Sequence, residues 1–147
     1  MASHSETFET VDGCRIRVMR KGRGEPLLFL HGASGAPAWA PFMEALSQHF
    51  DVIVPEHPGF GRSDDPEWLD GMEDLAFFYL DVIEHLGLGP VHLVGTSLGG
   101  WAAAEMAVRD PGAMRTLTLV APAGVNVPGV PRGDLFMWSP EETAKKR

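Results

Sequence analysis

The sequence predicts an α/β fold: a mostly parallel, twisted sheet with helices on both faces and a leading antiparallel hairpin. Two observations support this fold class. Short, unbroken apolar runs, typical of strands buried on both faces, alternate along the chain with segments whose apolar residues have helical spacing. An Asp-Gly pair between two short segments near the start marks a tight hairpin. Strands that alternate with helices assemble into parallel sheets, because each helix provides the crossover between two strands.

The composition is that of a single soluble domain. The chain has 147 residues, of which 44% are hydrophobic and 22% are charged. A formal net charge of -8 disfavours nucleic acid and anionic membrane surfaces as partners. No apolar run approaches the roughly 18 residues needed to span a bilayer, and the first ten residues do not resemble a secretory signal. We therefore expect no nucleic-acid or membrane partner, and the single cysteine fits a cytoplasmic protein without disulfides.

The first half of the chain is predicted to hold the hairpin, two buried strands and one helix. The hairpin strands cover residues 8–11 and 14–19. Residues 27–30 and 52–54 are apolar runs typical of buried strands, and residues 39–50 are expected to form a short helix between them.

The second hairpin strand alternates apolar and charged side chains. Cys14, Ile16 and Val18 share one face, whereas Arg15 and Arg17 lie on the other. This pattern predicts that Cys14 is a small buried apolar residue and not a reactive thiol.

The second half continues the alternation of helices and strands. Asp70 is expected to cap a helix that runs to about Leu86, because the apolar residues between them follow a helical period. Residues 91–94 and 117–120 are predicted to be buried strands, with an alanine-rich helix over residues 101–109 between them.

The end of the chain has the signature of a helix start. Ser139 is a good cap, a proline follows it, and Glu142 stands at the third helical position. The chain ends about two turns later, at Arg147, which is short for a stable helix. We therefore expect the chain to be truncated or cleaved, and a genuine short C-terminal helix is the alternative.

The sequence Gly95-Thr96-Ser97-Leu98-Gly99 matches the pattern G-x-S-x-G. An apolar strand leads into it and a helix of small residues leads out, which is the context of a nucleophile elbow. The flanking glycines permit a strained turn that exposes the serine hydroxyl. A phosphate-binding turn at a helix N-terminus is the alternative interpretation.

Two further glycine-rich loops follow the first two buried parallel strands. Residues 31–35, His-Gly-Ala-Ser-Gly, could donate backbone N–H groups that form an oxyanion hole together with the N–H of Leu98. His31 is expected to tie this loop down. Residues 57–63, His-Pro-Gly-Phe-Gly-Arg-Ser, form a tight loop at the same edge of the sheet.

These three motifs, in this order and on these elements, resemble the α/β-hydrolase family. The resemblance covers nearly the whole chain and implies a core domain begun by residues 1–124 and a cap or lid that opens in residues 125–147. It assigns roles to Ser97 as the nucleophile, to Ala33 and Leu98 as backbone donors to the oxyanion, and to His31, Gly32, Gly95 and Gly99 as supports of the motifs. It implies no cofactor, and the chain contains no metal-ligand spacing.

The family's order of catalytic residues is nucleophile, acid and histidine. The resemblance therefore implies that the acid and the histidine lie beyond Arg147 and that the core is incomplete. His31 and His57 are alternative bases, and Asp134 is an alternative acid. Because residues 117–120 are β-prone and uncharged, we expect a C-terminal segment or another chain to cover this edge of the sheet.

The function that the resemblance implies is hydrolysis of a carboxylic ester or similar small acyl substrate, with little activity in residues 1–147 alone. A carbon-carbon bond hydrolase of aromatic degradation is one alternative, although such enzymes usually carry Asn-Ser-Met where this chain has Thr96-Ser97-Leu98. A non-catalytic binding fragment or receptor is the other alternative.

Overall fold

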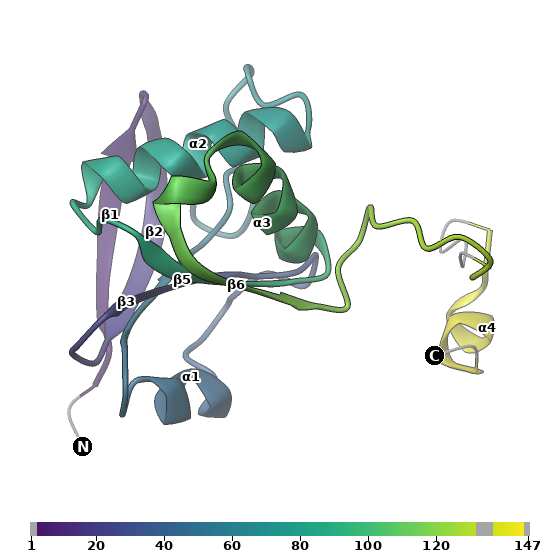
Figure 1. Ribbon diagram of the computed structural model, residues 1–147, viewed down its shortest axis with the longest axis horizontal. Coiled ribbons are helices and arrows are strands. Elements are labelled where there is room, and N and C mark those ends of the chain that lie inside the picture. Colours follow the sequence, from purple (N-terminus) through teal and green to yellow (C-terminus); the bar gives the residue numbers. More distant parts are fainter. Residues whose placement is uncertain (1–2, 132–136, 146–147) are drawn as a thin grey trace.

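The computed structural model describes residues 3–131 and 137–145. A six-stranded sheet has the order β1-β2-β4-β3-β5-β6, with α2 and α3 on one face and α1 on the other (Figure 1). The strands are β1 Ser5–Val11, β2 Cys14–Lys21, β3 Pro26–Leu30, β4 Asp51–Pro55, β5 Val91–Thr96 and β6 Met114–Val120. The helices are α1 Pro41–Leu46, α2 Met72–His85, α3 Leu98–Arg109 and α4 Pro140–Lys145, and a 3-10 turn covers Pro111–Ala113.

The pairing of the strands confirms the predicted fold class. β1 and β2 form the antiparallel hairpin, and β2 joins the sheet antiparallel to β4. β4, β3, β5 and β6 are mutually parallel. The segments that follow these four strands therefore meet at one edge of the sheet, where α/β folds commonly place their functional groups.

The central strands are apolar throughout because they contribute to a separate core on each face. Leu28 and Leu30 of β3 pack into the cluster beneath α2 and α3. Leu27 and Phe29, the alternate residues, pack into the cluster that contains Met43 of α1. Alternate side chains of a strand point to opposite faces, so a strand buried on both faces needs an unbroken apolar run.

Helix α1 is shorter than the predicted segment of residues 39–50. It begins at Pro41, whose fixed backbone suits the first helical position. Ser47 ends the helix, and its hydroxyl donates to the carbonyl oxygen of Glu44 at 2.8 Å. A serine that bonds to the backbone in this way competes with helix continuation, so the chain turns towards β4.

The starts of α2 and α3 also differ from the prediction. Gly71, and not Asp70, is the N-terminal cap of α2. The carboxylate of Asp74, inside the helix, accepts hydrogen bonds from the backbone N–H groups of Asp70 (3.0 Å) and Gly71 (3.1 Å). These bonds stabilise the N-terminus of the helix. Helix α3 begins at Leu98, three residues before the predicted Trp101, because the elbow leads directly into it.

The prediction of a buried strand over residues 117–120 is wrong for the described chain. The side chains of Leu117, Leu119 and Val120 are 40%, 37% and 48% exposed. Within the described residues, β6 pairs only with β5 and forms an edge of the sheet. An apolar run shows that a strand suits a buried position, but it does not show which segment covers it.

The predicted helix start near the C-terminus is confirmed. The N–H of Ser139 donates to the Glu142 carboxylate (2.9 Å), and the N–H of Glu142 donates to the Ser139 hydroxyl (3.2 Å). Helix α4 lies apart from the sheet (Figure 1). Of the predicted cap segment, residues 132–136 and 146–147 lie outside the described residues, and Asp134 is among them. No helix in the described part of the chain is long and apolar enough to cross a membrane.

Candidate active site

Ser97 occupies the turn between β5 and α3. Its backbone angles, φ 51° and ψ −115°, fall in the left-handed half of conformational space that non-glycine residues rarely adopt. Its N–H donates to Val120 (3.0 Å), and its carbonyl accepts from Trp101 (3.1 Å) and Ala123 (2.9 Å). These three bonds hold a conformation that costs about 1–3 kcal/mol, and the side chain is exposed.

The glycines of the elbow are required by close backbone contacts. A β carbon at Gly99 would lie 2.1 Å from the carbonyl oxygen of Leu30. A β carbon at Gly95 would lie 2.3 Å from the carbonyl oxygen of Gly99. The first turn of α3 therefore rests directly on the end of β3, and no larger residue fits at either position.

The loop after β3 lies beside Ser97. A β carbon at Gly32 would be 3.3 Å from Ser97 Cβ and 3.9 Å from Ser97 Oγ. The loop closes a turn in which the Gly35 N–H donates to the Gly32 carbonyl at 3.0 Å. Within the described residues, the N–H groups of Ala33 and Leu98 donate to no protein acceptor, so both are available to an oxygen atom of a ligand.

His31 and His57 form a buried chain of hydrogen bonds. The backbone N–H of His57 donates to His31 Nε2 at 2.9 Å, so His31 carries its proton on Nδ1 and donates it to the Gly32 carbonyl at 2.7 Å. His57 Nε2 donates to the His31 carbonyl at 2.7 Å, which leaves His57 Nδ1 to accept from the Tyr79 hydroxyl. The hydrogen-bond partners assign these tautomers.

Burial keeps both imidazoles neutral. Burial lowers the pKa of His57 to about 3, and burial also lowers the pKa of His31. Every ring nitrogen of the pair is already hydrogen-bonded, so neither histidine has a lone pair free to accept the Ser97 proton. In this structure His31 joins the loop after β3 to the loop after β4.

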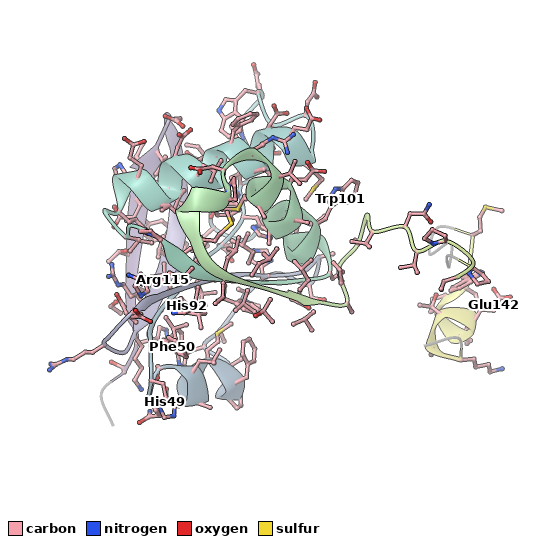
Figure 2. The ribbon with its side chains drawn as sticks, in the orientation of Figure 1. His49, Phe50, His92, Trp101, Arg115 and Glu142 are labelled. Atoms are coloured by element: carbon pink, nitrogen blue, oxygen red, sulfur yellow. The ribbon has the colours of Figure 1, made fainter. Side chains whose placement is uncertain are left out.

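None of the six histidines, all of them described, is hydrogen-bonded to Ser97. His92 lies near Arg115, away from Trp101 at the other end of the sheet (Figure 2). Its ring nitrogens are 2.8 Å from the Thr116 hydroxyl and 2.9 Å from the Glu25 carboxylate. The described residues also contain no group of three metal-ligating side chains.

A pocket of about 460 Å³ opens beside Leu98. Its lining includes the apolar side chains of Phe60, Leu98 and Trp101, together with Asp70, Glu73 and Glu105. Trp101 is 37% exposed, and its ring carbons lie 2.5–2.8 Å from where a β carbon of Gly124 would be, so it covers the segment leaving β6. Trp101 was predicted only as the start of a helix, although a residue four positions after Ser97 shares its side of the helix.

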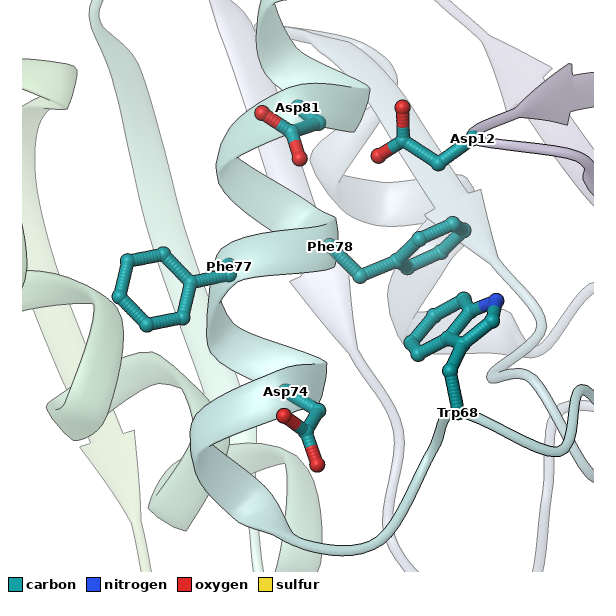
Figure 3. Close-up of a pocket in the computed structure, with 6 residues that line it drawn as sticks. All are labelled: Asp12, Trp68, Asp74, Phe77, Phe78 and Asp81. Carbon is teal, nitrogen blue, oxygen red and sulfur yellow. The ribbon is translucent and has the colours of Figure 1, made fainter.

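A second pocket, of about 260 Å³, lies between the hairpin turn and α2. Asp12 and Asp81 point toward one another across it, and Trp68 lies against Phe78 (Figure 3). Burial and a hydrogen bond with Asp12 raise the pKa of Asp81. None of the predicted site residues lines this pocket.

Comparisons with known proteins all relate this chain to hydrolase-fold proteins or their relatives. A family profile described as "alpha/beta hydrolase fold" matches residues 25–143. The "dihydrolipoyllysine-residue acetyltransferase component of acetoin cleaving system" of Cupriavidus necator is 34% identical over 125 residues, which are 84% of this chain and 33% of that protein. The "2-hydroxymuconate semialdehyde hydrolase" of Pseudomonas sp. strain CF600 is 35% identical over 121 residues, which are 79% of this chain and 43% of that protein.

Among solved structures, that of "a membrane phospholipase A, a novel bacterial virulence factor" has a TM-score of 0.79 and 30% identity. The match covers 84% of this chain and 41% of that protein. This chain therefore spans between a third and just under half the length of these three relatives.

Proposed function

Because the chain belongs to the α/β-hydrolase fold family, we propose that it carries the nucleophile and the oxyanion hole of a serine hydrolase. One observation supports this proposal most directly. The strained, exposed Ser97 lies beside the Gly32–Ala33 loop, with two backbone N–H groups, those of Ala33 and Leu98, free to bind an oxygen atom. A strained serine beside two unpaired backbone donors supports acyl transfer as the reaction class.

In the proposed reaction, Ser97 Oγ attacks the carbonyl carbon of an ester, and a general base accepts the hydroxyl proton. The carbonyl oxygen becomes an oxyanion that accepts hydrogen bonds from the Ala33 and Leu98 N–H groups. Expulsion of the alcohol, which takes up the proton, leaves an acyl-serine. Water then attacks this intermediate and releases the carboxylic acid.

We propose that the general base is a residue outside residues 1–147. His31 and His57 cannot act as this base, because they are neutral and both of their ring nitrogens are already hydrogen-bonded. Removing the base from a serine protease costs on the order of 10⁶-fold in rate. Residues 1–147 alone should therefore hydrolyse esters very slowly, with at most the roughly 10³- to 10⁴-fold advantage over water that an oxyanion hole retains.

The pocket beside Leu98 favours a neutral, apolar acyl group. Phe60 and Trp101 provide apolar surface, whereas Asp70 and Glu73 would repel a substrate carboxylate. A carbon-carbon bond hydrolase is the second candidate, favoured by the 35% identity to the 2-hydroxymuconate semialdehyde hydrolase. In both candidates Ser97 and the oxyanion donors have the same roles.

The remaining parts of the proposal concern the surroundings of this site. Residues 125–147 are proposed to begin a cap over the core, and further chain is proposed to pair with the exposed edge of β6. A reducing cytoplasm is proposed as the compartment, since Cys14 is free and buried.

Labelling with a fluorophosphonate probe tests the assignment. The enzyme that contains this chain should be labelled, the Ser97→Ala variant should not, and Ser34→Ala, which changes an exposed serine of the neighbouring loop, should label normally. Equal labelling of Ser97→Ala and the wild type would reject Ser97 as the nucleophile. Turnover of p-nitrophenyl butyrate against a 2-hydroxy-6-oxo-dienoate then separates the two candidate reactions.

A further inference from the structure

Arg17, in the middle of β2, is only 2% exposed. Its neighbours along the strand, Ile16 and Val18, point into the core beneath α2 and α3, so Arg17 points to the other face. Burying a guanidinium is unfavourable unless its charge and its donors are fully matched. The partners of Arg17 therefore reveal what this buried charge does.

The main partner is the carboxylate of Glu56, the residue that follows β4. Arg17 Nε and Nη2 donate to its two oxygens at 3.2 and 2.8 Å, and Arg17 Nη1 donates to Glu6 at 3.1 Å. Burial alone would raise the pKa of Glu56, but hydrogen bonds from Arg17 and from the Arg62 N–H (2.8 Å) outweigh it, so the pKa lies below its usual value. The pair is thus fully ionised at neutral pH.

The same guanidinium also reaches the loop after β3. Arg17 Nη2 donates to the carbonyl oxygen of Ala36, the residue after the turn of Gly32–Gly35 that contains Ala33. At the start of that loop, His57 holds His31 through two hydrogen bonds of 2.9 and 2.7 Å. The loop is therefore held at His31 by His57 and at Ala36 by Arg17, and the exposed Ala33 lies between these two points.

We propose that Arg17 is a positioning residue for the oxyanion hole: it fixes the loop after β3 by binding the Ala36 carbonyl and the Glu56 carboxylate together. This inference rests on the proposed function, because it gives the Ala33 N–H the role of oxyanion donor. Arg17 does not touch the substrate; it acts through the backbone between Ala36 and Ala33.

Only an arginine meets these demands. Its planar fork presents several fixed donors, whereas a lysine ammonium is a single point charge that cannot span the same acceptors in the same plane. The Glu56 carboxylate is also confined on another side, because a β carbon at Gly61 would lie 2.1 Å from Glu56 Oε1.

The test compares Arg17→Lys with Arg20→Lys in the enzyme that contains this chain. Arg20 is the matched control because it also lies in β2 and makes a bidentate pair with a carboxylate, that of Asp51 at the start of β4 (Nε to Oδ1, 2.9 Å), and contacts neither loop. Since removal of an oxyanion donor costs roughly 10²- to 10³-fold, a displaced donor in Arg17→Lys should lower kcat by about 10- to 100-fold. KM should change less than about twofold, and affinity for a trifluoromethyl ketone inhibitor should fall in parallel with kcat/KM.

Rates are expressed per Ser97 labelled by fluorophosphonate, so that unfolded molecules do not contribute. Arg20→Lys should retain wild-type kcat and inhibitor affinity. An Arg17→Lys enzyme with unchanged kcat, or with lowered kcat but unchanged inhibitor affinity, would overturn the positioning role while leaving the proposed function intact. If Arg17→Lys does not fold, Glu56→Gln is tested instead, and the same losses of kcat and of inhibitor affinity are expected. A wild-type enzyme that neither labels at Ser97 nor binds the inhibitor would overturn both proposals.

Discussion

Lowering the pH from 7 to 5 is expected to destabilise the protein by about 2 kcal/mol through His57 alone. Burial lowers the pKa of His57 to about 3 in the folded chain, against an ordinary 6.5 for histidine. As the pH falls, the unfolded chain binds the proton first. The stability linked to His57 is therefore complete above pH 6.5 and is lost progressively as the pH falls towards 3.

The size of the loss follows from the two pKa values. At pH 5 an exposed histidine is about 97% protonated, while folded His57 remains about 99% neutral. One pKa unit is worth about 1.36 kcal/mol, so the 1.5 units between 6.5 and 5 give about 2 kcal/mol. The lowered pKa of His31 adds to the loss, whereas Glu56, whose pKa is lowered from 4.5, loses its contribution only at more acidic pH.

Urea unfolding at pH 7, 6 and 5 measures this loss. His57→Gln should be less stable than the wild type at pH 7, because it gives up its bond with Tyr79, but its stability should fall by about 2 kcal/mol less between pH 7 and 5. His49→Gln, which changes an exposed histidine, should keep the slope of the wild type. If His57→Gln and the wild type lost equal stability over this range, His57 would not be the neutral, buried group described above.

Four further predictions concern single positions or one strand. Gly99→Ala, whose β carbon would lie 2.1 Å from the Leu30 carbonyl, should cost about 2–3 kcal/mol in urea unfolding, and an unchanged midpoint would contradict the close contact. Because burial raises the pKa of Cys14 to about 11, iodoacetamide at pH 8 should modify this thiol only after unfolding, and rapid modification of the native protein would show that it is accessible. Trp101→Ala should lower kcat/KM for p-nitrophenyl benzoate about tenfold relative to kcat/KM for p-nitrophenyl acetate, and Trp101→Phe should restore it. An unchanged ratio of the two values would show that the indole does not contact the acyl group. In residues 1–147 alone, the amides of 116–120 that face away from β5 should exchange rapidly with solvent, and slow exchange would show that this edge needs no partner.

The fold and the place of the elbow could be predicted because both follow from local patterns. Residues 27–30 are buried on both faces of the sheet, so all four are apolar. An amphipathic helix would have polar residues among them, and the unbroken run therefore indicates a strand. The glycines of the elbow are likewise specific, since the contact between Gly99 and Leu30 excludes any side chain. The loops after β3, β4 and β5 then lie at one edge of the sheet, because these strands are parallel.

The roles of the buried polar residues could not be predicted, because they depend on contacts between distant parts of the chain. Arg17 alternates with apolar neighbours and has the pattern of an exposed residue, yet Glu56 and Ala36 enclose it. His57 was an alternative base in the sequence analysis. Its neutrality follows from its burial, and one of its ring nitrogens is bonded to the hydroxyl of Tyr79, which lies 22 residues later.

The strand order also determines when each part of the protein can fold during synthesis. β3 lies between β4 and β5, both of which leave the ribosome after it, and the hairpin reaches the sheet only through β4. Arg17 must likewise wait for Glu56, 39 residues further along the nascent chain. Until then we expect the guanidinium to stay hydrated and the hairpin to stay undocked, because an arginine buried without its carboxylate is strongly unfavourable. Docking of the hairpin, pairing of β4 and closure of the loop at residues 57–63 should therefore be coupled to one another.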